Sequence, residues 1–212
     1  MKIQDIIAED KQVLDEFSTM DNDIYKALAA KGYSWLGKGV DQEAYLEPGG
    51  KTVLKIFGTQ GNQGKLSADQ KMFAQWADFC QKNSDNPFLP KFSGWETFEF
   101  KGKLYLQIRT ELLKPSGKLG LAIAKLGQAL AFNSADYYNL RTRHADDYKR
   151  VSAAVGEQNV PLLLNTLLEL IHKTHKKKKY NYDLHEGNIM MRRDGTPVFN
   201  DPYVLGENPS FF

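Results

Sequence analysis

The most informative pattern in the sequence is YNYDLHEGNIMMRRDGTPVFNDPYV, residues 180–204, near the C-terminal end of the chain. Its apolar residues form two short runs joined at Asp194-Gly195, a pair that favours a tight turn, so we predict a hairpin of two short buried strands. Asp183, Asn188 and Asp201 flank these strands. Carboxylate and amide oxygens are ligands that magnesium accepts, so the stretch predicts a cation site around a buried hairpin.

Composition and charge indicate an ordinary globular chain. It has 212 residues, enough for one core or two small lobes, and a formal net charge of +2, so no overall field favours nucleic acid as a partner. The single cysteine, Cys80, excludes an internal disulfide and is compatible with a reducing compartment. Acidic residues interrupt the start, MKIQDIIAEDKQ, too early for a signal peptide, and no apolar run is long enough to span a bilayer. We therefore expect a cytoplasmic protein with no membrane partner.

The first half of the chain reads as strands with one inserted helix. Residues 2–31 have apolar residues at helical spacing and precede Gly32, a typical helix end, so we expect residues 1–32 to form an N-terminal helical extension. Ser67 is suited to cap a helix that runs to Gln81. Runs of aromatic and β-branched residues between turns predict five strands, the first three of them an antiparallel meander. The strands span residues 33–36, 43–46, 52–57, 91–100 and 104–109.

The second half reads as mainly helical. Apolar stripes predict helices over residues 119–133 and 160–175, the second with Pro161 in its first turn. Residues 134–156 between them are polar, and the pattern does not decide their structure. The order of elements, strands with one helix and then mainly helices, predicts an α+β fold.

The polar residues around the hairpin suit phosphoryl transfer, in which an enzyme holds a polyphosphate with magnesium and directs a hydroxyl at its terminal phosphorus. Asp183-Leu-His-Glu-Gly-Asn188 has the spacing of a kinase catalytic loop, and here the chain resembles the protein kinase-like superfamily. The resemblance implies that Asp183 accepts or orients the substrate hydroxyl proton. It also implies that Asn188 and Asp201 hold magnesium (Mg²⁺), with ATP as the phosphate donor.

Two features of this stretch depart from the common protein kinases. Asp201-Pro202-Tyr203 replaces the usual Asp-Phe-Gly, and a proline stiffens the peptide against a regulatory flip of the aspartate. His185 is more similar to the aminoglycoside phosphotransferase and choline kinase branch. Under the resemblance His185 either approaches the terminal phosphate or fixes the loop, and both roles stay open.

A glycine-bearing turn and a lysine on a strand extend the resemblance upstream. Gly37-Lys38-Gly39-Val40 precedes the second strand, where glycines let backbone N–H groups approach phosphate, although Gln42 stands at the family's third glycine. Alone, this motif indicates an ordinary turn. Lys55 lies between apolar residues on the third strand and matches the lysine that contacts the inner phosphates. The alternative interpretation is that Lys55 lies on an edge strand and its side chain faces water.

The family's lysine pairs with a glutamate on the following helix, and this chain has no glutamate between its third and fourth predicted strands. Asp69 is the best substitute, and it either pairs with Lys55 or stays solvated near the helix N-terminus. Glu111 and Leu112 lie where the family's hinge would present backbone groups to adenine. The basic run Lys176–Lys179 either stays solvated or attracts an acidic or nucleic-acid-bound substrate.

The resemblance implies a two-lobed fold, with a five-stranded N-lobe at residues 33–109 and a reduced, mainly helical C-lobe at residues 110–212. Only 11 residues follow Asp201, and small bacteriophage-encoded protein kinases are similarly abbreviated. The leading hypothesis is therefore an ATP- and magnesium-dependent serine/threonine protein kinase with a protein substrate. Two alternatives stay open: a small-molecule kinase of the aminoglycoside phosphotransferase type, and a non-catalytic pseudokinase that acts by binding.

Overall fold

The computed structural model describes residues 22–39, 42–58, 65–133, 137–177 and 180–205. The chain divides into two compact units. Unit 1 takes the described residues up to Ser84 together with Lys91–Leu112, and unit 2 takes Asp85–Pro90 and the described residues from Leu113 onward. Within the described ranges, no helix is both long enough and apolar enough to cross a bilayer.

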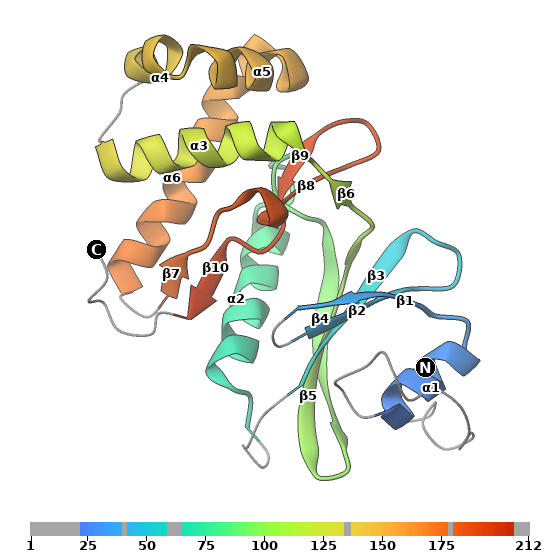
Figure 1. Ribbon diagram of the computed structural model, residues 1–212. Helices are drawn as coiled ribbons and strands as arrows, with labels where there is room; N and C mark the ends of the chain where they lie inside the picture. The colour runs from blue at the N-terminus through green and yellow to red at the C-terminus, as the bar shows by residue number, and fades with distance from the viewer. Residues whose placement is uncertain (1–21, 40–41, 59–64, 134–136, 178–179, 206–212) are drawn as a thin grey trace. The chain divides into compact units, whose positions relative to one another are not determined.

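Unit 1 is built on a five-stranded antiparallel sheet (Figure 1). Its strands lie in the order β1-β2-β3-β5-β4, so β3 is the central strand. The five predicted strands and the meander of the first three are confirmed. Two ends were wrong by two residues: β1 continues past Leu36 to Lys38, which pairs with β2, and β5 continues past Arg109 to Glu111, which pairs with β3. The strands are β1 (Ser34–Lys38), β2 (Gln42–Leu46), β3 (Thr52–Phe57), β4 (Phe92–Phe100) and β5 (Lys103–Glu111).

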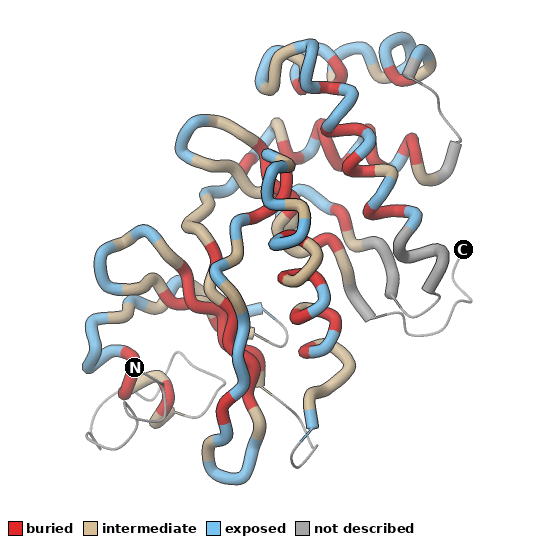
Figure 2. Tube along the Cα trace, turned by 180° about the vertical axis from the view of Figure 1, so that it is seen from behind, coloured by how far each residue is buried: buried red, intermediate tan, exposed pale blue. Residues whose placement is uncertain are grey.

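Each face of this sheet carries one helix and an apolar core. Ile56 points to the face covered by α1 (Asn22–Ala30), and Phe57, the next residue, points to the face covered by α2 (Ala68–Lys82). Figure 2 shows the buried positions running along the central strands β3 and β5. The core on the α1 face comprises Ile24, Ala27, Leu28, Tyr45, Leu54, Ile56, Phe98 and Tyr105. The core on the α2 face comprises Phe57, Ala74, Ala77, Leu106 and Ile108.

The ends of the two helices follow the sequence signals. Helix α1 ends at Ala30, and Gly32 has φ +81°, the left-handed conformation that favours glycine, so the predicted helix end is confirmed. The remainder of the predicted N-terminal helical region, residues 2–21, lies outside the described residues. Ser67 caps α2 as predicted: its Oγ accepts the N–H of Gln70 at 3.1 Å, and Gln70 Oε1 accepts the N–H of Ser67 at 2.9 Å.

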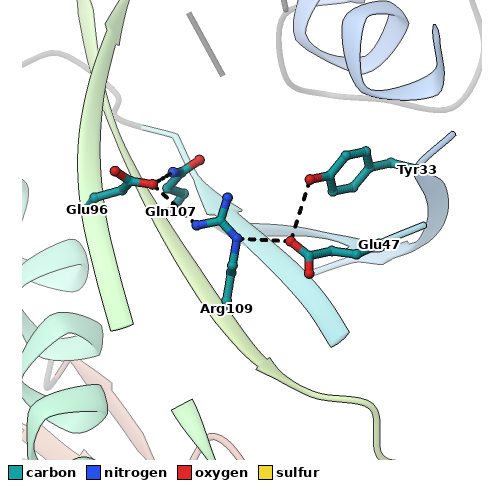
Figure 3. A network of polar contacts seen from close by, with 5 residues as sticks. All are labelled: Tyr33, Glu47, Glu96, Gln107 and Arg109. Carbon is teal, nitrogen blue, oxygen red and sulfur yellow. Dashed lines mark hydrogen bonds and ion pairs between the residues drawn. The ribbon is translucent and has the colours of Figure 1, made fainter. Parts of the chain in front are cut away.

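A polar network lies on the α1 face of the sheet (Figure 3). Arg109 donates from Nε to Glu47 Oε1 at 2.9 Å and from Nη1 to Glu96 Oε1 at 3.2 Å. The Tyr33 hydroxyl also donates to Glu47, and the Gln107 amide donates to Glu96. Burial opposes the charge on Arg109, but its hydrogen bonds to the two carboxylates raise its pKa above the usual value. A permanently charged guanidinium on β5 therefore binds Glu47, beyond the end of β2 on the far side of β3, and Glu96 on the neighbouring strand β4.

Replacing this guanidinium should weaken unit 1. We expect Arg109→Met to lower the free energy of unfolding by about 1–2 kcal/mol, because two carboxylates lose a charged donor at a site that stays partly exposed. Urea unfolding measures the change. Arg109→Lys keeps the charge but loses the planar arrangement of donors, so its free energy of unfolding should lie between those of wild type and Arg109→Met. Wild-type stability in Arg109→Met would mean that the network contributes nothing.

Unit 2 combines helices with two small antiparallel sheets (Figure 1). In one sheet the strands lie in the order β6-β8-β9, and in the other β7 pairs with β10. The helices are α3 (Lys118–Asn133), α4 (Tyr137–Arg143), α5 (Ala145–Val155) and α6 (Val160–Lys177). The strands are β6 (Lys114–Pro115), β7 (Tyr180–Tyr182), β8 (Ile189–Met191), β9 (Pro197–Phe199) and β10 (Tyr203–Leu205).

The two predicted helices of this unit are confirmed as α3 and α6, and the undecided segment between them forms α4 and α5. The stripe on α6 is buried at Leu163, Leu164 and Leu167. Helix α5 buries only Tyr148 and Val151, which explains why its polar sequence gave a weak helical signal.

The predicted hairpin at the end of the chain is confirmed as β8 and β9. Its turn closes with the N–H of Arg192 donating to Thr196 O at 2.9 Å, and Gly195 has φ +92°. Asp194 Oδ1 accepts the N–H of Thr196 at 2.9 Å, and this hydrogen bond lowers the pKa of Asp194. The turn therefore holds the two strands in the register Ile189 to Phe199.

Candidate functional site

Two short strands bring the ends of the 183–201 stretch together. Strand β7 ends at Tyr182, which pairs with Tyr203 at the start of β10. The N–H of Asp183 continues this pairing by donating to Pro202 O at 2.9 Å. The backbone of Asp183 therefore lies beside the residue that follows Asp201, although the two aspartates are separated by the whole hairpin in sequence.

Asn188 fills the space beside Asp183. It ends a single 3₁₀ turn, η3 (Glu186–Asn188), and its Nδ2 donates to Asp183 O at 2.7 Å and to Asp183 Oδ2 at 3.2 Å. Because the amide nitrogen makes both contacts, the carbonyl oxygen Oδ1 is the atom of Asn188 that can bind a cation. The amide thus orients the Asp183 carboxylate and offers a metal ligand at the same time.

Asn200 connects Asn188 to Asp201, the two candidate metal ligands. Its backbone N–H donates to Asn188 O at 2.9 Å, and its side-chain Nδ2 donates to Asp201 Oδ2 at 2.9 Å. The sequence analysis missed Asn200, because an asparagine beside an aspartate is not a signal without knowledge of the pairing across the hairpin. Asp201 is half-buried, so a cation bound there would be only partly shielded from water.

These oxygens fit a magnesium ion. The described residues contain no group of three or more His, Cys, Asp or Glu side chains that could hold a metal. A site here would use the amide oxygen of Asn188 and the carboxylate of Asp201, with the Asp183 carboxylate left for the acceptor hydroxyl. Magnesium usually takes one or two carboxylates and completes its shell with phosphate oxygens and water. The donor set therefore suits magnesium delivered with a polyphosphate better than a metal enclosed by protein ligands alone.

His185 caps the turn that carries Asn188. Its Nδ1 accepts the N–H of Gly187 at 3.0 Å, and its Nε2 lies 4.0 Å from Asp183 Oδ2. In the neutral ring the proton is therefore on Nε2, the nitrogen nearer the carboxylate. This contact gives His185 a part in shaping the loop, and its approach to a terminal phosphate stays a prediction.

The stretch from Asp183 to Ile189 also packs against Ser116 and the first turn of α3. Ser116 Oγ donates to Ile189 O, and β6 pairs with β8 immediately beyond that carbonyl. A methyl group at Gly120 would collide with Ser116 Oγ and lie 3.2 Å from Glu186 O and 3.3 Å from Ile189 O. Gly120 lies in a helix without the backbone conformation that requires glycine, so the missing side chain serves close packing. The sequence analysis missed Ser116 and Gly120, since a glycine inside a helix pattern has several explanations.

Gly120→Ala tests whether the close packing at Gly120 positions the loop that contains Glu186 and Ile189. Alanine favours a helix by about 1 kcal/mol over glycine, so the helix itself should not weaken. The new methyl group should instead push the loop carbonyls away and lower kcat by about 10- to 100-fold, as small displacements of a catalytic group do. Phosphate transfer from ATP measures the effect.

The double variant Ser116→Ala/Gly120→Ala serves as the control. It removes the hydroxyl collision and leaves the two carbonyl contacts, so its kcat should stay below that of Ser116→Ala alone. Wild-type kcat in Gly120→Ala would show that the loop tolerates the methyl group and that the contact has no positioning role.

Lys55 lies on the central strand of unit 1. It pairs with Ala44 of β2 and Ile108 of β5, and it is 8% exposed, so it is not a solvent-facing lysine on an edge strand. By alternation its side chain points to the same face as Phe57, the face covered by α2. A buried ammonium on that face is suited to a phosphate, and the phosphate contact stays a prediction.

Asp69 lies in the first turn of α2 and is half-buried. The α2 residues in the core against β3 and β5 are Ala74 and Ala77, which carry no charge. Asp78, further along the helix, accepts the Trp95 Nε1–H at 2.8 Å. The two alternatives for Asp69, pairing with Lys55 or staying solvated near the helix N-terminus, both stay predictions.

The glycine-bearing turn is the connection of the β1–β2 hairpin. Gly37 and Lys38 belong to β1, and the N–H of Gly39 donates to Gln42 O at 2.8 Å. Val40 lies outside the described residues. The described residues expected to bind phosphate thus lie at the turn of the β1–β2 hairpin. Their contact with a nucleotide stays a prediction.

Glu111 and Leu112 follow the central part of β5. Glu111 is still on the strand, and its side-chain Oε1 accepts the N–H of Lys91 at 2.9 Å. The N–H of Leu112 donates to Lys51 O at 3.1 Å. The N–H of Glu111 donates to Lys91 O at 3.1 Å, so both backbone N–H groups are bonded within unit 1, and contact of this backbone with adenine stays a prediction.

The candidate residues divide between the two units. Unit 1 carries Lys55, Asp69, Glu111, Leu112 and the glycine-bearing turn, and unit 2 carries Asp183, His185, Asn188 and Asp201. The basic run has its first two lysines in the last turn of α6, and its side chains lie outside the described part of the chain.

Comparisons with known proteins found only distant structural likeness. No family model and no curated protein matches the sequence. One similar solved structure is the MAP kinase LmaMPK10 from Leishmania major, with 16% identity, a TM-score of 0.40, and coverage of 84% of this chain and 50% of that one. Another is monomeric WbdD, with 15% identity, a TM-score of 0.28, and coverage of 74% and 30%. The chain thus spans half the length of the first and less than a third of the second.

Proposed function

We propose that the protein is an ATP- and magnesium-dependent phosphotransferase that acts on a hydroxyl group. The observation that carries the proposal is the contact of one amide, Asn188 Nδ2, with both the backbone and the carboxylate of Asp183, beside the Asn200 bond to Asp201. The carboxylates of Asp183 and Asp201 and the amide oxygen of Asn188 come from adjoining stretches of backbone. They are the kinds of group that magnesium-assisted phosphoryl transfer needs.

In this proposal Asn188 Oδ1 and Asp201 would hold magnesium, which when bound neutralises charge on the phosphates. Asp183 Oδ2, oriented by Asn188 Nδ2, accepts or orients the proton of the attacking hydroxyl. Lys55 holds the inner phosphates, and Gly37, Lys38 and Gly39 contribute backbone N–H groups. The backbone at Glu111 and Leu112 holds the adenine. Asp69 supports Lys55, and His185 maintains the loop around Asp183.

We propose a protein serine or threonine as the acceptor and the cytoplasm as the place of action. The motif resemblance to reduced protein kinases supports the acceptor, and the supply of ATP supports the location. No nucleic-acid or membrane partner is part of the proposal.

A small-molecule hydroxyl is the second candidate acceptor. The observation that favours it is that residues 137–155, which the sequence pattern left undecided, form the two additional helices α4 and α5 between α3 and α6. His185 supports it as well, since the resemblance links this histidine to the aminoglycoside phosphotransferase branch.

Incubation with ATP labelled on the γ-phosphate tests the proposal. We expect Mg²⁺-dependent transfer of label to the protein itself or to a protein in a lysate, and none in EDTA. Label that appears only in a pool of small hydroxylated metabolites would favour the second candidate. Absence of label in every mixture, together with no thermal stabilisation by ATP with or without Mg²⁺, would contradict the proposal. Stabilisation without transfer would favour a pseudokinase.

A further inference from the structure

Six residues that follow α2 in sequence belong to unit 2 rather than to unit 1. The segment Asp85–Pro90 leaves unit 1 after Ser84, and the chain returns to unit 1 at Lys91. Phe88 and Leu89 are each only 2% exposed. This segment is therefore packed within unit 2 and is not a solvated connection.

Hydrogen bonds attach the segment to both strands of the β8–β9 hairpin. Arg192, the residue after β8, donates from Nη1 to Pro87 O and from Nη2 to Leu89 O at 2.8 Å. Phe199 of β9 donates its N–H to Phe88 O at 3.0 Å. Three successive carbonyls of the segment are thus bound by the hairpin, two of them by one guanidinium.

Helix α6 holds the same segment from another side. Asn86 Nδ2 donates to Thr166 Oγ1 at 2.9 Å, and Asn86 Oδ1 accepts the N–H of Phe88 at 3.0 Å. Thr166 is 3% exposed, so this attachment is to a buried part of the helix. The segment therefore acts as a fixed support against which the hairpin is held.

The supported hairpin carries the candidate metal ligands at its ends. Asn188 immediately precedes β8, and Asp201 follows β9 after Asn200. Arg192 follows β8, the strand that begins next to Asn188, and its two hydrogen bonds fix the end of that strand. We propose that Arg192 is a positioning residue, which clamps the hairpin to Asp85–Pro90 and so maintains the separation of Asn188 and Asp201 that the metal requires. This proposal rests on the proposed function.

The chain offers a matched control in the next residue. Arg193 has the same charge and lies on the same hairpin, but it is exposed and makes no hydrogen bond to the segment. Arg192→Met and Arg193→Met therefore remove the same charge from adjacent positions of the hairpin. Only the first also removes the clamp.

Two measurements together test the proposal. The first is hydrogen–deuterium exchange in the metal-free protein, and the second is the dissociation constant of Mn²⁺, measured by electron paramagnetic resonance with a non-hydrolysable ATP analogue. Arg192→Met should speed exchange in peptides that contain Phe199 and Asn200 and should weaken Mn²⁺ binding by about tenfold, as loss of an outer support of a metal site does. Arg193→Met should leave both values unchanged.

Arg192→Lys keeps the proposal testable where Arg192→Met does not fold. Lysine keeps the charge but cannot bridge two carbonyls with a planar fork, so Mn²⁺ binding should be weaker than in wild type. Wild-type exchange and wild-type Mn²⁺ affinity in Arg192→Lys and Arg192→Met would overturn the proposal, and so would equal changes in Arg193→Met. If the wild-type protein itself binds no Mn²⁺, the proposed function is wrong. The exchange measurement then decides by itself whether Arg192 holds the hairpin.

Discussion

Asp183→Ala should lower the rate of phosphate transfer by about 10³-fold, the middle of the range that a positioned general base contributes. The reason is geometric: Asp183 Oδ2 is the oxygen oriented by Asn188 Nδ2, and no other described carboxylate shares that contact. Binding of ATP and magnesium should change little, because Asn188 and Asp201 remain. Single-turnover kinetics measure the rate, and calorimetric titration measures the affinity.

Asp194→Ala is the matched control for the loss of a carboxylate. Asp194 lies in the turn of the same stretch, is exposed, and accepts the N–H of Thr196 at 2.9 Å. Its removal should affect the turn and leave the rate within about twofold of wild type, because surface changes away from the reacting groups have small effects. Equal rates in Asp183→Ala and wild type would remove Asp183 from the reaction.

Asp201→Asn should act on metal binding rather than on proton transfer. The change keeps the shape of the side chain and removes its charge, and Asn200 Nδ2 still has an oxygen to contact. We expect the magnesium concentration needed for half-maximal nucleotide binding to rise by more than about tenfold, since loss of an outer partner of a metal site already costs about 10- to 100-fold. Titration of Mg²⁺ at fixed ATP measures this shift.

The comparison of the two variants separates the roles. Asp183→Ala should lose rate at wild-type affinity, whereas Asp201→Asn should recover much of its rate at saturating metal. Equal losses of nucleotide affinity in the two variants would contradict the division between proton acceptor and metal ligand.

The strands of unit 1 could be predicted because their residues repeat a local pattern. Thr52–Phe57 is an apolar run bounded by turns, and the structure assigns β3 to the same residues. The exact end of β5 could not be predicted, because it depends on pairing with Thr52 and Val53 in another strand. Helices α4 and α5 were undecided for a different reason: they bury few residues, so their helical period is weak.

Three of the small strands of unit 2, β6, β7 and β10, could not be predicted from the sequence pattern. β7 and β10 have three residues each and β6 has two, too few for alternation to be visible. Yet the pairing of β7 with β10 is what brings Asp183 beside Pro202. Spacing alone suggested a common site for the hairpin residues, and the supports for that site come from distant parts of the chain.

The same limit explains the residues that were missed. Arg192 is one of two adjacent arginines, and only the fold distinguishes the one that binds the Asp85–Pro90 carbonyls. Gly120 is a glycine in a helical pattern, and its reason is the carbonyls of Glu186 and Ile189. In both cases the partner is a backbone carbonyl, which every residue has and no sequence motif marks.

We propose that Lys55 of unit 1 and Asp183, Asn188 and Asp201 of unit 2 bind one and the same nucleotide. A crystal structure with a non-hydrolysable ATP analogue and Mg²⁺ is the decisive test. We predict that the metal is bound by Asn188 Oδ1 and Asp201, with Lys55 Nζ within hydrogen-bonding distance of a phosphate oxygen of the same nucleotide. A nucleotide bound elsewhere, or one whose phosphates lie far from Lys55 Nζ, would contradict the claim.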